Sequence, residues 1–119
     1  MDAQYTSFFA SSEVASTQAG VVADVIYTVP AKFDAEVTLL VCTNGAAADK
    51  INIQVYRADG TAYHYLLRAH SVGANDSYNA ITSNRLFLHS GDKIVAYKVG
   101  GTFDVSVSGK QYFNAVRNV

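Results

Sequence analysis

The chain has 119 residues, of which 50% are hydrophobic and 16% charged. This composition fits one domain that can bury a core, because a domain of about this length buries roughly two thirds of the surface of its unfolded chain. Nine Lys and Arg side chains against ten Asp and Glu give a formal charge of -1 without any basic run, which argues against a nucleic-acid partner.

The first twenty residues are rich in Ser, Ala, Thr and Gln and carry three aromatic side chains, Tyr5, Phe8 and Phe9. They contain no basic segment followed by a long apolar run, so we expect neither a signal peptide nor a membrane span, and synthesis in a cytoplasm. Three aromatic rings are too many for a purely solvated tail. We therefore divide the chain into residues 1–20, an N-terminal arm or edge strand, and residues 21–119, a β-sandwich domain.

Five later segments place apolar side chains at every second position, which is the period of a half-buried β-strand. They are residues 21–29, 35–42, 50–57, 92–99 and 102–108. Pro30 ends the first of them, because proline has no N–H to donate to a strand ladder. The second becomes apolar on both faces toward Cys42, which favours a central strand.

Turn signals separate these strands. Residues 58–61 form the strongest hairpin signal, and residues 63–67 form its return strand. Residues 68–84 are polar and turn-rich, and we interpret them as a connection across the end of a sandwich. A corner at residues 88–94 contains Asp92, which we expect to bond backbone N–H groups two residues on. This spacing predicts an all-β fold: a single-domain antiparallel β-sandwich, jelly-roll-like, with an extended N-terminal arm.

Side chains that could carry catalysis or bind a metal are scattered along the chain. His64 and His70 are six residues apart and His89 lies at the corner, so no pair has the spacing of a zinc site. Cys42 lies in an apolar run and is expected to be a buried, inert thiol. A cupin-like enzyme on the same fold would need clustered His and Glu ligands. We therefore expect no enzyme, no metal and no cofactor.

Aromatic side chains form the most promising functional signal. Tyr56, Tyr63 and Tyr65 flank the hairpin, and Tyr97 is expected on the same outward sheet face. Tyrosine suits strand packing, protein interfaces and stacking on sugars, and all three interpretations stay open. Both termini also mix aromatic with polar residues, as an assembly protein that reaches its neighbours would. The candidate interface residues are Tyr5, Phe8, Phe9, Tyr56, Tyr63, Tyr65, Tyr112 and Phe113.

Four segments together resemble small β-sandwich structural proteins of tailed bacteriophages. They are residues 25–31, 36–44, 88–94 and 103–109, and the resemblance extends over roughly residues 21–109. It implies a non-enzymatic virion protein, most simply a capsid decoration or cement protein that stabilises the head by bridging capsid subunits. The implied partners are the major capsid protein and further copies of the chain, with a trimer favoured, and neither nucleic acid nor membrane. The implied location is the virion, assembled in the host cytoplasm; the alternative is a tail or fibre module that binds a host receptor or glycan.

Overall fold

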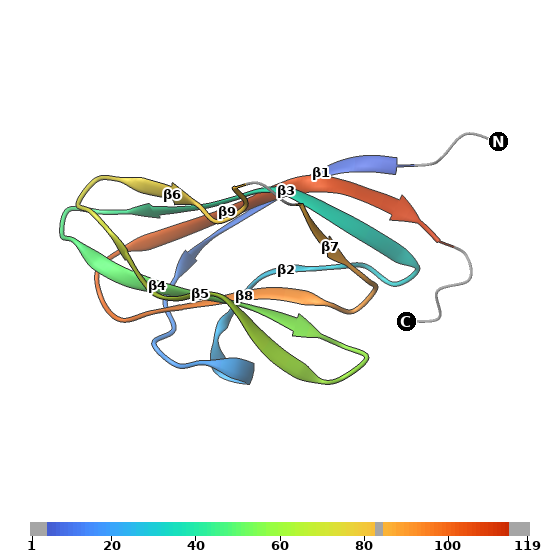
Figure 1. Ribbon diagram of the computed structural model, residues 1–119, viewed down its shortest axis with the longest axis horizontal. Helices are drawn as coiled ribbons and strands as arrows, with labels where there is room; N and C mark the ends of the chain where they lie inside the picture. The colour runs from blue at the N-terminus through green and yellow to red at the C-terminus, as the bar shows by residue number, and fades with distance from the viewer. Residues whose placement is uncertain (1–4, 83–84, 115–119) are drawn as a thin grey trace.

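The computed structural model describes residues 5–82 and 85–114, and Figure 1 shows two facing β-sheets. The elements, in chain order, are β1 (Tyr5–Val14), a short 3₁₀ turn η1 (Gly20–Val22), β2 (Asp24–Thr28), β3 (Phe33–Asn44), β4 (Asp49–Arg57), β5 (Ala62–Val72), β6 (Ser77–Asn79), β7 (Leu86–Leu88), β8 (Lys93–Lys98) and β9 (Phe103–Phe113). Every strand pair is antiparallel. The predicted all-β sandwich is confirmed.

The strand order is that of a jelly roll. One sheet runs β1-β9-β3-β6 and the other β2-β8-β4-β5. Both β6 and β7 pair with the same side of β3, β6 along residues 41–43 and β7 along residues 35–37. They therefore share one strand position, which leaves four positions in each sheet, as in a jelly roll of eight strands. β3 lies between β9 and these two short strands, so its predicted central place is confirmed.

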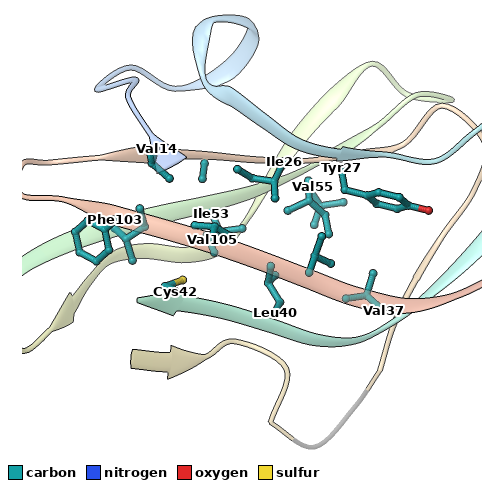
Figure 2. Packing of buried hydrophobic residues seen from close by; sticks show 14 of the residues in the cluster. Val14, Ile26, Tyr27, Val37, Leu40, Cys42, Ile53, Val55, Phe103 and Val105 are labelled. Carbon is teal, nitrogen blue, oxygen red and sulfur yellow. The ribbon is translucent and has the colours of Figure 1, made fainter. Parts of the chain in front are cut away.

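The core lies between the sheets and is built from the inward side chain of every second residue. Figure 2 shows Leu40 of β3 and Val105 of β9 on one side, with Ile53 and Val55 of β4 on the other. Leu40, Ile53 and Phe103 are fully buried. Burial of one such side chain contributes about 1.5–3 kcal/mol, so the alternation seen in the sequence is the main source of stability.

The first predicted strand, residues 21–29, is wrong in its extent, and its period of two breaks at Val25. Gly20 adopts a positive φ of 75° and begins η1, so β2 starts only at Asp24. A register shift between Val25 and Tyr27 then interrupts the pairing with β8. As a result Ile26 turns inward with Tyr27, while Val25 stays 48% exposed, which a strict period of two does not allow.

The polar stretch 68–84 is likewise not one long connection. β5 continues to Val72, and a further strand, β6, follows at Ser77–Asn79. Ala69 interrupts β5 with a φ of 48°, and the side-chain oxygen of Asn52 accepts a hydrogen bond from its N–H at 2.7 Å. This contact holds the irregular residue and lets the strand resume. The last strand also extends beyond Ser108, to Phe113, because it pairs with β1 and β3 along that length.

A buried carboxylate closes the end of the sandwich where β2–β3, β4–β5 and β7–β8 turn. Asp92 is 2% exposed. Its Oδ2 accepts hydrogen bonds from Arg57 Nη1 at 3.0 Å and from His89 N at 2.9 Å, and its Oδ1 accepts one from Ala58 N at 2.9 Å. The Asp92 carbonyl accepts a further bond from Val29 N. The carboxylate reaches back three residues and across to a second hairpin, rather than two residues on as predicted.

At the opposite end of the sandwich, the uncharged side chain of Asn44 takes the place that Asp92 has at the first end. Asn44 is 4% exposed, and its amide nitrogen donates to the carbonyls of Ala47 at 2.8 Å and Val72 at 2.9 Å. Gly45 N donates to the Asn44 side-chain oxygen and to the carbonyl of Thr102. Three connections, β3–β4, β5–β6 and β8–β9, are therefore held by one buried side chain and its neighbour.

Replacing Asp92 with Ala should lower the free energy of unfolding by about 3 kcal/mol, because an ionised partner and two partly buried N–H groups would lose their acceptor. Urea unfolding followed by circular dichroism measures this loss. Asp104→Ala is the matched control, since Asp104 is exposed on β9, and we expect a change within about 0.5 kcal/mol. Equal effects of the two variants would contradict the role given to Asp92.

Gly109→Ala should also be destabilising, by about 1–3 kcal/mol. A Cβ at Gly109 would lie 2.0 Å from the carbonyl oxygen of Glu36, beside the register shift between β3 and β9, so the backbone would have to move. Gly60→Ala provides the comparison, because a Cβ there would meet nothing within 4 Å. The same urea measurement should show no loss for Gly60→Ala; a neutral Gly109→Ala would mean that the two strands separate easily at this point.

Candidate interaction surfaces

The eight candidate interface residues do not form one surface. Tyr5, Tyr112 and Phe113 join Phe33 in a terminal aromatic cluster at the end of the β1-β9-β3 sheet. Tyr56, Tyr63 and Tyr65 join Tyr97 in a hairpin tyrosine cluster on the outer face of the other sheet. Phe8 and Phe9 belong to neither. The candidates are therefore distributed over both sheets of the sandwich.

The terminal aromatic cluster is assembled by strand register. Tyr5 lies opposite Tyr112, and Phe33 lies opposite Phe113. In each pair the rings meet edge to face, with centroids 5.9 Å and 5.7 Å apart respectively. Tyr5, Phe33 and Phe113 line an open hollow of about 240 Å³ together with Thr6. Since Tyr5 and Phe113 remain 51% and 54% exposed, this hollow offers apolar surface to a partner.

Charged side chains border the terminal cluster and fix one of its rings. The Tyr112 hydroxyl donates to Glu36 Oε1 at 3.1 Å, and Arg85 pairs with Glu36 at 3.0 Å. Desolvation and the hydrogen bond to Glu36 raise the pKa of Tyr112, so the hydroxyl stays a donor at neutral pH. Lys110 Nζ lies 4.8 Å from the centre of the Tyr5 ring, a cation–π distance.

Phe8 and Phe9 separate by the alternation of β1. Phe8 points between the sheets and stacks on Tyr27, with ring centroids 4.3 Å apart and planes 6° apart. It packs against the core and so contributes to folding within the chain. Phe9 points outward and is 71% exposed. Of these two neighbours, Phe9 is the one whose ring lies on the outer surface.

The hairpin tyrosine cluster lies on the outer face of the β2-β8-β4-β5 sheet. The register places Tyr56 opposite Tyr63, with ring centroids 4.9 Å apart, and the Tyr65 and Tyr97 hydroxyls share a hydrogen bond. The expected shared face is therefore present. Burial raises the pKa of Tyr97 to about 12, whereas the hydrogen bond with Tyr97 lowers the pKa of Tyr65.

Two cations lie against these rings. Arg68 Cζ is 4.2 Å from the centre of the Tyr65 ring, and Lys93 Nζ is 5.5 Å from that of Tyr56. The neighbouring part of the same outer face is covered by the connection from β1 to β2. Gly20 N in that connection donates to Gln54 Oε1 at 3.1 Å, and Gln54 is only 4% exposed. The tyrosines lie on the part of the face that this connection leaves open.

His89 and Cys42 have structural roles in the fold. His89 Nδ1 lies 3.2 Å from Asp34 Oδ1, and the adjacent Ser90 hydroxyl donates to the carbonyl of Phe33 at 2.6 Å, so both tie the β7–β8 corner to β3. Across the described ranges, no three His, Cys, Asp or Glu side chains come together as metal ligands. Within the same ranges no helix is long and apolar enough to cross a membrane. Cys42 is fully buried, as expected.

No protein-family model matches this chain, and no curated protein matches its sequence. Its structure is similar to a chain in the structure of infectious bursal disease virus, Gx strain, with a TM-score of 0.51 and 16% sequence identity. The similarity covers 98% of this chain and 34% of the viral chain, so this chain spans about a third of that chain's length. At this identity the likeness shows the fold: an antiparallel β-sandwich that also occurs in a virus particle.

Burial raises the pKa of Cys42 to about 12, so its thiol should be unreactive in the native chain. Ionisation of Cys42 therefore costs more free energy in the folded chain than in the unfolded chain. The stability that the neutral thiol gives the folded chain is lost as the pH rises from about 8.5, the ordinary pKa of a thiol, toward 12. At pH 8 a chromogenic disulfide reagent should label Cys42 only after guanidinium is added. Ala46→Cys, on an exposed loop, should add one thiol that reacts at once. Rapid labelling of native Cys42 would contradict the described packing.

Proposed function

We propose that this chain is a non-enzymatic structural protein of a virion, and more specifically a capsid decoration or cement protein that bridges subunits of a phage head. The observation that carries the proposal is the placement of exposed aromatic surfaces on both sheets of a rigid sandwich. The terminal cluster lies on one sheet and the hairpin tyrosine cluster on the other. A protein that contacts two neighbours at once needs two such surfaces.

The likeness to a chain of infectious bursal disease virus supports a virion role at the level of the fold. The narrower assignment, to the head of a tailed bacteriophage, is supported by the sequence resemblance in residues 25–31, 36–44, 88–94 and 103–109. The same resemblance supports the major capsid protein as partner, a trimeric state and a location in the virion. In this proposal the terminal cluster and the hairpin cluster each contact a different capsid subunit.

The mechanism requires no chemistry at either surface. A protein that binds only the assembled shell stabilises it by mass action, by about 2.7 kcal/mol when its free concentration is a hundred times the dissociation constant. Aromatic side chains dominate the energy of such contacts because they bury a large rigid area. The buried hydrogen bonds of Asp92 and Asn44 hold both ends of the sandwich and so keep the two surfaces at a fixed separation.

A second function, a tail or fibre module that binds a host glycan, is favoured by one observation. In the hairpin cluster, tyrosine rings adjoin the hydrogen-bonding side chain of Arg68, which lies 4.2 Å from the Tyr65 ring centre. Planar rings beside polar donors suit stacking on a sugar. This function needs only the hairpin cluster, whereas bridging needs the terminal cluster as well.

The test mixes the purified chain with capsids of its virus that lack it, pellets the particles, and records bound stoichiometry and the temperature of genome release. We expect saturable binding and a higher release temperature, because added contacts exist only on the assembled shell. Phe113→Ser and Tyr65→Ser should each weaken binding about tenfold or more, since each removes an exposed aromatic anchor from one surface.

Val21→Ser is the matched control. Val21 is 86% exposed but lies outside both clusters, so this variant should bind like the unaltered chain. Loss of binding through Tyr65→Ser alone, together with adhesion to host polysaccharide, would support the tail module. Absence of any binding to capsids would overturn the cement proposal.

A further inference from the structure

The free edges of the two sheets differ in how well they are protected. β2 is five residues long and its pairing is interrupted by a register shift. β6 and β7, which share the edge next to β3, are three residues each. β5 is longer, but its register with β4 shifts twice and Ala69 adopts a φ of 48°. Short, irregular edges of this kind resist the addition of a further strand.

β1 has none of these protections. It has ten residues, and its register with β9 runs without a shift from Tyr5 to Val14. Figure 1 shows β1 running along β9. It contains no Pro, Lys or Arg, and its one charged residue is Glu13. Every second residue of an edge strand points its N–H and C=O away from the sheet. Among the described residues, these outward groups of β1 have no backbone partner.

The side chains of β1 would not obstruct a neighbouring strand. Its outer face presents Phe9 between Ser7 and Ser11, and these two serines are small. The ring of Phe9 is 71% exposed, the highest exposure among the aromatic residues of the described chain. A strand added beside β1 would cover one side of this ring and satisfy the backbone groups at the same time.

We propose that the strand added is β1 of a second copy of this chain, antiparallel about a two-fold axis, with Phe9 opposite Phe9. This register places Ser7 of one copy opposite Ser11 of the other, and Tyr5 opposite Glu13. No like charges face each other, so β1 is complementary to itself. A two-fold axis perpendicular to the sheet keeps the outer faces of both copies on the same side. The two sheets, each with four strand positions, then become one continuous sheet of eight positions.

Two-fold pairing closes after two copies, because each copy uses its β1 edge once. The expected oligomer of this chain is therefore a dimer, in contrast to the trimer that the sequence resemblance implies. It stands on the geometry of β1 and does not require the proposed role in a virion. Failure of capsid binding would leave it intact.

Sedimentation velocity on the purified full-length chain tests the pairing. The unaltered chain should sediment as a species of twice 12.8 kDa at high concentration and dissociate on dilution. Phe9→Lys and Phe9→Glu should each raise the dimer dissociation constant by about 100-fold, because like charges juxtaposed across an interface repel. An equimolar mixture of the two variants should restore the dimer, since the ammonium group of one copy would then lie opposite the carboxylate of the other.

Phe87→Lys is the control, since Phe87 is 60% exposed on the β7 edge of the same sheet. It should leave the dimer unchanged. Both substituted side chains are exposed, so urea unfolding should show that the variants fold. A monomer at the highest soluble concentration, a trimer, a mixture that stays monomeric, or loss of the dimer through Phe87→Lys would each overturn the proposal.

Discussion

The buried carboxylate of Asp92 is the constraint on which the arrangement of this sandwich most depends. It lies just before β8, yet it holds Arg57 and Ala58 from the β4–β5 hairpin, and Arg57 in turn donates to the carbonyl of Phe87 in β7 at 2.9 Å. The Asp92–Arg57 pair thus connects strands of both sheets. An ionised group taken out of water is stable only when such partners surround it. The same partners therefore fix where the connections of this end can lie.

Buried hydrogen bonds hold both ends of the sandwich. Side chains on the outer faces of the sheets are therefore not needed to keep the two sheets together. Much of the face around Gln54 is covered by the β1–β2 connection, which leaves the tyrosines of the β4–β5 hairpin exposed beside it. On the other sheet, Phe9 and the rings near Phe113 are exposed because no further layer covers them. Exposed aromatic residues cost solubility, so their concentration on surfaces of a rigid scaffold favours an assembly role.

Pairing through β1 and capsid bridging concern different parts of this surface and can act together, with a dimer in place of the trimer that the sequence resemblance implies. Pairing through β1 uses a strand edge and Phe9, whereas capsid bridging uses the terminal and hairpin clusters. A dimer would present two copies of each cluster, the terminal clusters at the ends of the continuous sheet and the hairpin clusters on the second sheet of each copy. Linked sites bind a repetitive lattice more tightly than single sites do, because the second contact is intramolecular. Contacts that are individually weak would therefore be enough to hold a dimer on an assembled shell.

The sequence by itself determined the elements whose cause is local. Alternation with a period of two was enough to predict the sandwich and a central strand ending near Cys42, and the turn at residues 58–61 was enough to predict the hairpin. The alternation of apolar and polar residues also indicated that Tyr56 and Tyr97 lie on the same outward face of a sheet. Only the tertiary structure decided where the period breaks, as at Ile26 and Ala69, because a register shift depends on a neighbouring strand far away in the sequence. The partners of Asp92 and the division of the aromatic residues between two sheets depend in the same way on pairings across the chain, which no local pattern encodes.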